Sequence, residues 1–373
     1  VHEYIGPGAA FVTGWTDWFC WISLAMADVT AAGLYIQYWL PGVERWVPSL
    51  IILCFLFAMN LMAVKVFGEL EFWLALIKVI AILGLIVGGA ILIYTGATTD
   101  AGAMTFANLW QNGGWFPNGT SGFILSFQMV VFAFTGIELV GLTAGETENP
   151  KKVIPQAINN IPIRIIIFYV GALAVIMSIY PWTVVSPSSS PFVQVFTVAG
   201  ITAAAAIVNF IVLTSAASAC NSGLFSTSRM VYTLAREGNA PHMMFRLRSN
   251  HVPMNAVVFS ALVIFIAVVL QYIMPESVFV FITSISTFCF IFIWAIIVIC
   301  HILYRRRKPE VAKKNIFKMP LYPVMNYLIL AFFVFVLASL AFNDETRIAL
   351  LLTPLWFAML WCFYKIKSAK ATD

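Results

Sequence analysis

Residues 121–144 read SGFILSFQMVVFAFTGIELVGLTA. Apart from Glu138 the run carries no charge, and it is long enough to cross a bilayer as a helix, since about 20 residues span the hydrocarbon core. In its second half, Thr135 and Gly136 are residue types that weaken a helix or hydrogen-bond to its backbone. The stretch therefore predicts a membrane helix that is interrupted next to a carboxylate.

The rest of the chain has the same character. Of 373 residues, 61% are hydrophobic and 10% are charged, and the mean hydropathy is +0.93, whereas soluble domains carry about 25% charged residues. We therefore predict an all-α, polytopic membrane protein with about ten transmembrane helices. The expected spans are roughly 10–39, 48–64, 72–95, 121–144, 161–182, 193–228, 254–273, 277–302, 322–342 and 348–364.

The positive charges predict the orientation of these spans. Eighteen of the 21 Lys and Arg residues fall on one side of the membrane, Arg45 and Arg347 fall on the other, and Lys78 lies inside a span. Because cytoplasmic loops carry the excess of Lys and Arg, both chain ends are expected in the cytoplasm. The net charge of +5 is explained in this way and indicates no nucleic-acid partner.

Four ionisable residues fall inside apolar spans, where a charge is costly and a functional role is the first hypothesis: Asp17, Asp28, Lys78 and Glu138. Glu138 is interpreted as a proton carrier or as the partner of a cation, with a protonated, packing-only glutamate as the alternative. For Lys78 the alternatives are snorkelling to the cytoplasm and a buried position where it replaces a bound sodium ion and changes protonation.

Asp17 and Asp28 are eleven residues apart, almost three helical turns, so they share one helix face. Asp28 lies near mid-depth, which favours a role near the substrate or in the proton route over plain structural pairing. Asp17 is shallower, and its role stays open.

Small polar residues form two further clusters. Ser215, Ser218, Ser222 and Ser226 recur on one stripe of the span at 193–228, which either lets helices approach closely or lines a cavity. The group at 283–287 has the same two interpretations. The sequence has no phosphate-binding loop, nucleophile elbow, zinc motif or CxxC spacing, so we expect a protein that is not an enzyme and has no metal or cofactor.

Several motifs in order along the chain resemble the bacterial amino acid transporter family of the amino acid/polyamine/organocation (APC) superfamily. They are Gly14-Trp15-Thr16, Gly68-Glu69, Ile77-Lys78, Phe134 to Gly141, Thr143 to Thr147, Asn149-Pro150, Asn221-Ser222-Gly223, Ser228-Arg229-Met230 and Lys318-Met319-Pro320. Within the family, Met26-Ala27-Asp28, Thr214 to Ser218 and Thr353 to Phe357 are most similar to D-serine/D-alanine/glycine transporters.

This resemblance implies a LeuT-like fold of twelve helices, built from two inverted five-helix repeats and two more helices. Residues 1–373 would form one permease domain, in which 1–95 supply helices three to five, 121–302 helices six to ten, and 322–366 helices eleven and twelve. The chain begins at Val1 as if a loop were already in progress, so we expect the first two of the twelve helices to be missing. Asp17 also stands where relatives usually carry an aromatic or amide residue.

By the same resemblance the protein imports small neutral amino acids, such as D-alanine, D-serine and glycine, with protons across the bacterial inner membrane by alternating access. Proton coupling would rest on Glu138 and Lys78. The substrate-binding residues would be Phe134, Thr135, Gly136, Ile137, Asp28 and Ser218. Asp28 is the natural partner of the ammonium group, and backbone N–H groups at the interruption are the partners of the carboxylate.

Three other functions remain open. A permease of the same family can instead transport proline, histidine or an aromatic amino acid. A truncated chain can persist as a packing or sensor subunit that no longer transports. A membrane-embedded transferase would need catalytic residues clustered at one membrane face, and the sequence shows none.

Overall fold

A computed structural model describes residues 1–61, 65–99, 102–138, 149–185, 189–248, 252–315, 317–342 and 344–370. Within these ranges the chain is almost entirely helical, and the one sheet is a hairpin of β1 (Thr98–Thr99) and β2 (Gly102–Ala103). Among the described residues, eight helices are long and apolar enough to cross a membrane, and α2 (Trp46–Asn60) and α5 (Gly119–Ala133) are shorter apolar helices. Each of the ten predicted spans overlaps one of these helices, which confirms the all-α, polytopic class.

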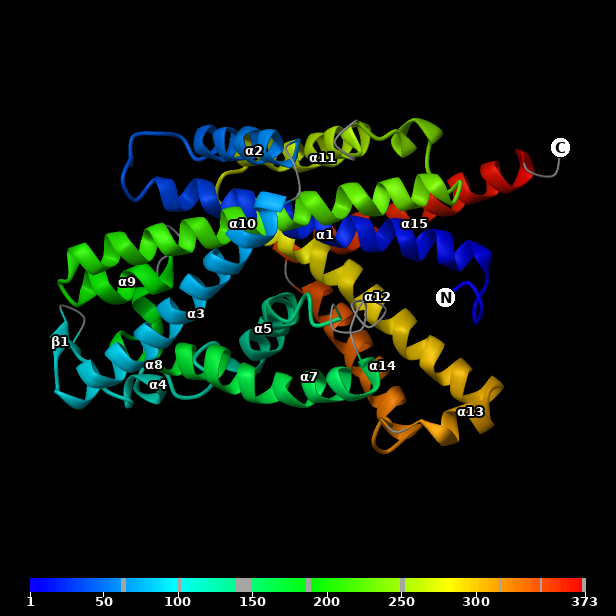
Figure 1. Ribbon diagram of the computed structural model, residues 1–373. Helices are drawn as coiled ribbons and strands as arrows, with labels where there is room; N and C mark the ends of the chain where they lie inside the picture. Colours follow the sequence, from blue (N-terminus) through cyan, green and yellow to red (C-terminus); the bar gives the residue numbers. More distant parts are fainter. Residues whose placement is uncertain are drawn as a thin grey trace.

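Four helices pack against one another: α1 (Pro7–Ile36), α2 (Trp46–Asn60), α10 (Thr202–Arg236) and α11 (Met254–Ile273). In Figure 1, α2 and α11 lie along the upper edge of the molecule, with α1 and α10 beneath them. Their facing sides form the largest apolar core, which includes Ile22, Val29, Leu56, Leu224 and Ile264. Fifteen residues of α1 are buried, so α1 is enclosed by its neighbours along most of its length.

Small residues allow these helices to approach closely. A Cβ placed on Gly223 of α10 would lie 2.9 Å from the Cβ of Ala25 on α1. About one turn further along α1, Ser49 Oγ donates to Gln271 Oε1 (2.7 Å). Gln271 Nε2 in turn donates to the carbonyl of Thr30 (3.1 Å). Polar side chains that bond between helices in this way tie α1, α2 and α11 together.

A second apolar core joins α3 (Lys65–Tyr94), α8 (Ala172–Ile179) and α9 (Pro191–Val198). The chain reaches α8 through α7 (Pro150–Ile165) and the π-helical turn η2 (Ile166–Gly171). Pro162 inside α7 has no N–H for the helical ladder, and such a gap is accommodated by wider turns.

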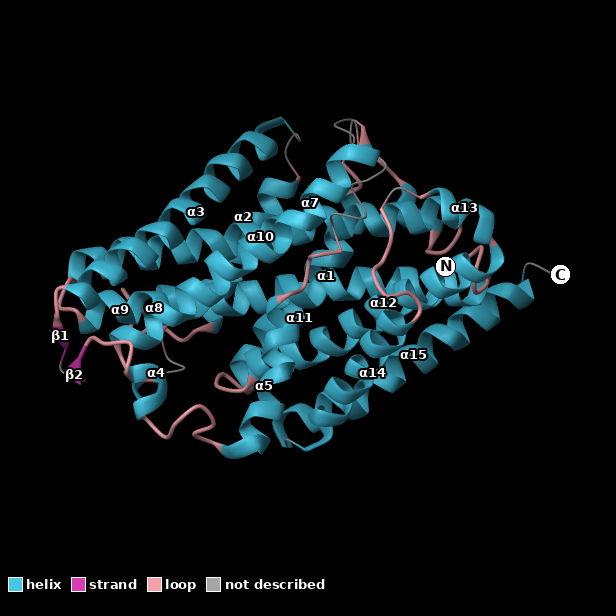
Figure 2. Ribbon diagram, turned by 90° about the horizontal axis from the view of Figure 1, so that it is seen from below, coloured by secondary structure: helices cyan, strands magenta, loops and turns pink. Residues whose placement is uncertain are grey.

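The remaining spans lie on the other side of α1. They are α5 (Gly119–Ala133), α12 (Val278–Arg307), α14 (Val324–Ser339), which continues into η5 (Leu340–Phe342), and α15 (Asp344–Lys370). The short helices are α4 (Asn108–Gln111), η3 (Trp182–Val184), η4 (His242–Phe245) and α13 (Pro309–Lys314). Both views place α13 and the two chain ends at one end of the molecule and the β1–β2 hairpin at the other (Figure 2).

Two predicted spans differ from the observed helices. The single span expected over 193–228 is two helices, because Gly200 adopts a φ of +75° after α9 and ends that helix before α10 begins at Thr202. The span expected over 161–182 begins eleven residues earlier, at Pro150. Proline at the first helical position lacks only an N–H that would be unpaired there, so it starts a helix readily.

Candidate functional site

The helix formed by the apolar run 121–144 stops at the place where the sequence predicts an interruption. Helix α5 ends at Ala133, and residues 134–138 form turns. Gly136 adopts a φ of +94°, a conformation that side chains disfavour. The hydroxyl of Thr135 donates to the carbonyl of Phe132 (2.8 Å). The motif residues 139–148 lie outside the described part of the chain.

The π-helical turn η2 supports the end of α5. Tyr169 donates its hydroxyl to the carbonyl of Ala133 (2.8 Å), and its ring packs on Phe134 with 5.5 Å between centroids. The last carbonyls of a helix have no partner within the helix, so this bond satisfies one of them. Ile137, predicted to bind substrate, is exposed.

Glu138 lies between α12 and α1. The indole Nε1–H of Trp294 on α12 donates to its Oε2 (3.0 Å). From α1, the carboxylate of Asp17 interacts electrostatically with Glu138. The ring of Trp21, one turn beyond Asp17, lies 3.7 Å from the point where Gly136 would carry a Cβ. The interruption is therefore packed directly against α1.

Lys78 of α3 points into the bundle rather than snorkelling to the membrane surface. Its Nζ donates to Ser218 Oγ on α10 (3.2 Å), and its charge acts on Asp28 of α1. A cavity of about 210 Å³ lies beside Lys78, lined also by Ser215 and otherwise by apolar residues of α3, α9 and α10.

Asp28 is the third member of this group. Its Oδ2 is buried and, within the described part of the chain, has no hydrogen-bond partner. Asp28 lies eleven residues from Asp17, or about 16 Å along α1. The structure thus brings the candidates together in two groups on one face of α1, with Glu138 in one and Lys78, Asp28 and Ser218 in the other.

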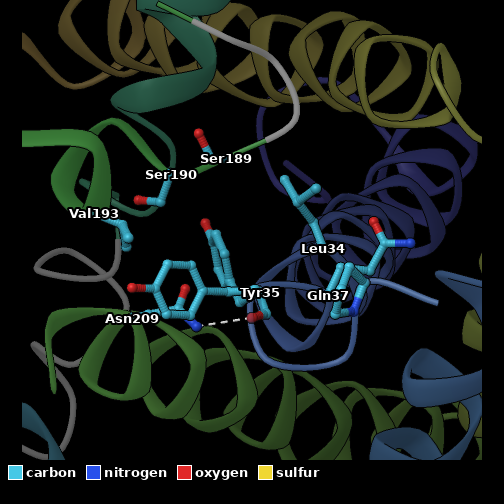
Figure 3. A pocket seen from close by; sticks show the side chains of 9 residues that line it. Leu34, Tyr35, Gln37, Ser189, Ser190, Val193 and Asn209 are labelled. Carbon is cyan, nitrogen blue, oxygen red and sulfur yellow. Dashed lines mark hydrogen bonds between the residues drawn. The ribbon is translucent and has the colours of Figure 1, made fainter. Parts of the chain in front are cut away.

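A polar pocket lies at the end of α1 that faces the hairpin. It has a volume of about 210 Å³ and is lined by Tyr35, Ser189, Ser190 and Asn209, among others (Figure 3). Asn209 Nδ2 donates to the backbone carbonyl of Tyr35 (2.8 Å), which fixes α1 to α10. Tyr35 is seven residues, about two turns, beyond Asp28, so this pocket continues the helix face on which Asp28 lies.

Three residues that form hydrogen bonds in or next to the site were not predicted from the sequence. Trp294 was missed because a tryptophan in an apolar helix is indistinguishable from a packing residue. Tyr169 was missed because nothing local marks a π-helical turn. Gln128 of α5 was detectable as a polar residue within an apolar span. Its Nε2 lies 3.4 Å from Thr283 Oγ1 and 3.5 Å from Thr287 Oγ1 of α12. One cluster of hydroxyls thus joins α5 to α12.

The described residues contain no group of three or more His, Cys, Asp or Glu side chains that could hold a metal ion. The carboxylates of Asp17, Asp28 and Glu138 and the amine of Lys78 are groups that can bind charged partners and exchange protons inside an apolar bundle.

Comparison with known proteins decides the family. The model of the amino acid permease family matches residues 1–373. The chain belongs to this family. The permease is 66% identical to the Bacillus subtilis protein named uncharacterized transporter YdgF (99% of this chain, 81% of the relative) and 62% identical to the B. subtilis amino-acid permease AapA (99% and 80%).

A third relative bears on the substrate. The D-serine/D-alanine/glycine transporter of Escherichia coli strain K12 is 49% identical over 373 residues, which cover 98% of the permease and 79% of the relative. These relatives are named as transporters or permeases, in agreement with a protein that is not an enzyme. Membrane spans and bacterial relatives together indicate a multi-pass protein of the inner membrane.

Proposed function

We propose that the permease imports small neutral amino acids, such as D-alanine, D-serine and glycine, together with protons by alternating access. The choice of substrate is supported by the similarity to the E. coli transporter. The observation that carries the transport mechanism is the interruption of α5 at 134–138, which ends on a carboxylate inside the helix bundle.

An interrupted membrane helix offers backbone groups that a continuous helix keeps bonded to itself. Its N–H groups can bind a carboxylate and its C=O groups can bind a cation, and transporters place such sites near the bilayer midplane. In our proposal the substrate lies along Phe134, Thr135, Gly136 and Ile137, with its carboxylate on N–H groups of the interruption. Asp28 and Ser218 belong to the second group, about 10 Å further along α1 than Trp21. In our proposal the ammonium group therefore pairs with Asp28, beside Ser218, at another step of the transport cycle than the one in which the carboxylate is bound at the interruption.

Two groups would carry the coupled proton. Glu138 is ionisable and buried at one oxygen, so taking up a proton removes a charge from the bundle. Lys78 donates a hydrogen bond to Ser218 near Asp28. It carries a positive charge inside the bundle when it is protonated and no charge when it is deprotonated. Changes of charge in an apolar environment shift conformational equilibria, because each state stabilises one protonation form better than the other. With the orientation predicted from the Lys and Arg distribution, both ends of the chain lie in the cytoplasm.

The test is the uptake of labelled D-alanine and glycine, measured between acidic and neutral pH in cells that express the protein. We expect uptake to rise in acid, to collapse with a protonophore, and to be lost in Glu138→Gln and Lys78→Met. Glu310→Gln and Lys313→Met are matched controls, because these two residues form an exposed ion pair outside the bundle.

Two results would contradict parts of the proposal. Uptake of proline, histidine or an aromatic amino acid in place of D-alanine and glycine would overturn the substrate. Undiminished, acid-stimulated uptake in Glu138→Gln and Lys78→Met, at equal protein levels in the membrane, would remove these residues from the coupling mechanism.

A further inference from the structure

The end of α12 that leads into α13 carries an excess of positive charge. Seven of the residues 305–318 are Lys or Arg, and one of them, Glu310, is an acid. Glu310 is paired with Lys313 (2.9 Å). Arg305 and Arg306 form no ion pair within the described part of the chain, so no acid of the described protein neutralises their charge. Figure 1 shows this end of α12, with α13, at the lower right of the molecule.

Two tyrosines near the start of α14 position both guanidinium groups. The guanidinium carbon of Arg305 lies 4.4 Å from the centre of the Tyr322 ring. Arg306 Nη2 donates to the hydroxyl of Tyr327 (2.9 Å). A guanidinium that is already stacked or hydrogen-bonded loses less conformational freedom on binding an anion than a freely rotating side chain does. The two positive charges are therefore held next to each other, ready for one anionic group.

An exposed face of α14 begins at the same place. Val324, Tyr327, Ala331 and Val334 are all exposed and recur at helical spacing, so they lie on one side of the helix. Residues 324–342 are apolar enough to cross a membrane. The bond from Arg306 to Tyr327 thus joins a positive charge to the first turns of an apolar face that the bilayer covers.

We propose that Arg305 and Arg306, with Tyr322 and Tyr327, form a binding site for an anionic phospholipid. The phosphate of the lipid binds the two guanidinium groups, whose N–H groups match phosphate oxygens. Its acyl chains lie along the exposed face of α14. Tyrosine is enriched at the membrane–water interface, which places both rings at the level of the lipid headgroups. Basic residues next to the end of a membrane helix attract anionic lipids.

The test measures the Tm of the purified protein in a neutral detergent, with phosphatidylglycerol or phosphatidylcholine added. A ligand that binds the folded state raises Tm, so phosphatidylglycerol should raise it and phosphatidylcholine should not. The double variant Arg305→Gln/Arg306→Gln should bind the anionic lipid about 25-fold more weakly, because each basic residue near an anionic surface contributes a factor of about five. The rise in Tm should therefore be lost over the same range of lipid.

The double variant Arg246→Gln/Arg248→Gln is the matched control. It removes two exposed arginines from the segment between η4 and α11, so it changes the net charge by the same amount. We expect phosphatidylglycerol to raise its Tm as it does for the unaltered protein. An equal loss in both double variants would show that total positive charge attracts the lipid, and it would overturn the proposed site.

Three other results would also overturn the proposal. Phosphatidylcholine could raise Tm as much as phosphatidylglycerol does, or Arg305→Gln/Arg306→Gln could leave the rise unchanged. Inorganic phosphate could raise Tm as much as the anionic lipid, which would indicate a site for a free anion. Should the Gln variant fail to accumulate, Arg305→Lys/Arg306→Lys decides, because it keeps both charges and loses the planar N–H groups. Its rise in Tm should be smaller, and an equal rise would overturn the site.

Discussion

Gly223 and Gly136 are both glycines within apolar segments, but the structure requires them for different reasons. Gly223 lies in a continuous helix, α10, where a Cβ would meet the Cβ of Ala25 at 2.9 Å. Gly136 has room for a Cβ, with the nearest described atom at 3.7 Å, yet its φ of +94° is disfavoured by any side chain. Gly223 is required because a side chain would not fit between the helices, whereas Gly136 is required because of its backbone conformation.

This difference distinguishes a tightly packed region from one in which a helix stops. Around Gly223, the helices α1, α2, α10 and α11 are tied by buried apolar contacts and by the bonds from Ser49 and Gln271. Around Gly136, α5 stops short, and a π-helical turn bonds to its last residue. Insertions of π-helix occur often at functional sites. In an alternating-access cycle we expect the first region to act as the frame and the second to rearrange.

The largest predicted loss of stability is in the frame formed by α1, α2, α10 and α11. Gly33→Ala would place a Cβ 2.1 Å from Ser49 Oγ and 2.5 Å from the carbonyl of Arg45, so the bonded group of Ser49 and Gln271 must give way. Overpacking combined with a broken buried polar contact costs about 3 kcal/mol. We expect a strongly lowered Tm or loss of the purified protein.

Gly84→Ala is the control for that substitution. Gly84 lies in α3 with no described atom within 4 Å of its Cβ position. Replacing an exposed helical glycine with alanine stabilises a helix by up to about 1 kcal/mol, so its Tm should be unchanged or higher. Equal loss of stability in both variants would refute the picture of a tightly packed frame and a looser α3.

A smaller effect is predicted at the interruption. Gly136→Ala has space for its methyl group but strains the backbone by roughly 1–2 kcal/mol. Gly200→Ala is the matched control, because Gly200 has a φ of +75° in open space between α9 and α10. We expect similar decreases of Tm for both variants, but reduced uptake of labelled amino acid only for Gly136→Ala. Reduced uptake in Gly200→Ala as well would show that strain anywhere, rather than at the interruption, limits transport.

The contact between η2 and α5 permits a finer test. Tyr169→Phe keeps the ring against Phe134 and removes the hydroxyl bonded to Ala133, a loss of about 1 kcal/mol. Tyr180→Phe removes the same kind of bond, from Tyr180 to the carbonyl of Pro191 (3.0 Å), at the end of α8. If η2 controls the interruption, initial uptake rates should change in Tyr169→Phe and stay constant in Tyr180→Phe. Equal uptake in the two variants would restrict η2 to a structural role.

The sequence was sufficient for the class of fold, because apolar runs of about 20 residues have few interpretations. It also indicated the interruption, because Thr135 and Gly136 stand side by side, two residues before a carboxylate, in an otherwise apolar run. It could not show that Gly200 ends a helix, because the same residue type is tolerated inside α10 at Gly223. It also could not show that Trp294 bonds to Glu138, because the two residues lie 156 positions apart and only packing brings them together.

The smallest predicted effect is at the surface, where Glu3 and Lys308 form an ion pair that ties the start of the chain to the end of α12. The bond from Lys308 lowers the pKa of the Glu3 carboxyl below its usual value of 4.5. A lowered pKa in the folded state means that the pair stabilises the protein above pH 4.5 and that this contribution disappears as the pH falls through the lowered pKa. Glu3→Gln should therefore lower Tm slightly at neutral pH and not at all in strong acid, a difference that added salt also reduces. A Tm difference that is large, or that grows in acid, would show that residues 1–6 belong to the rigid frame rather than to its exposed margin.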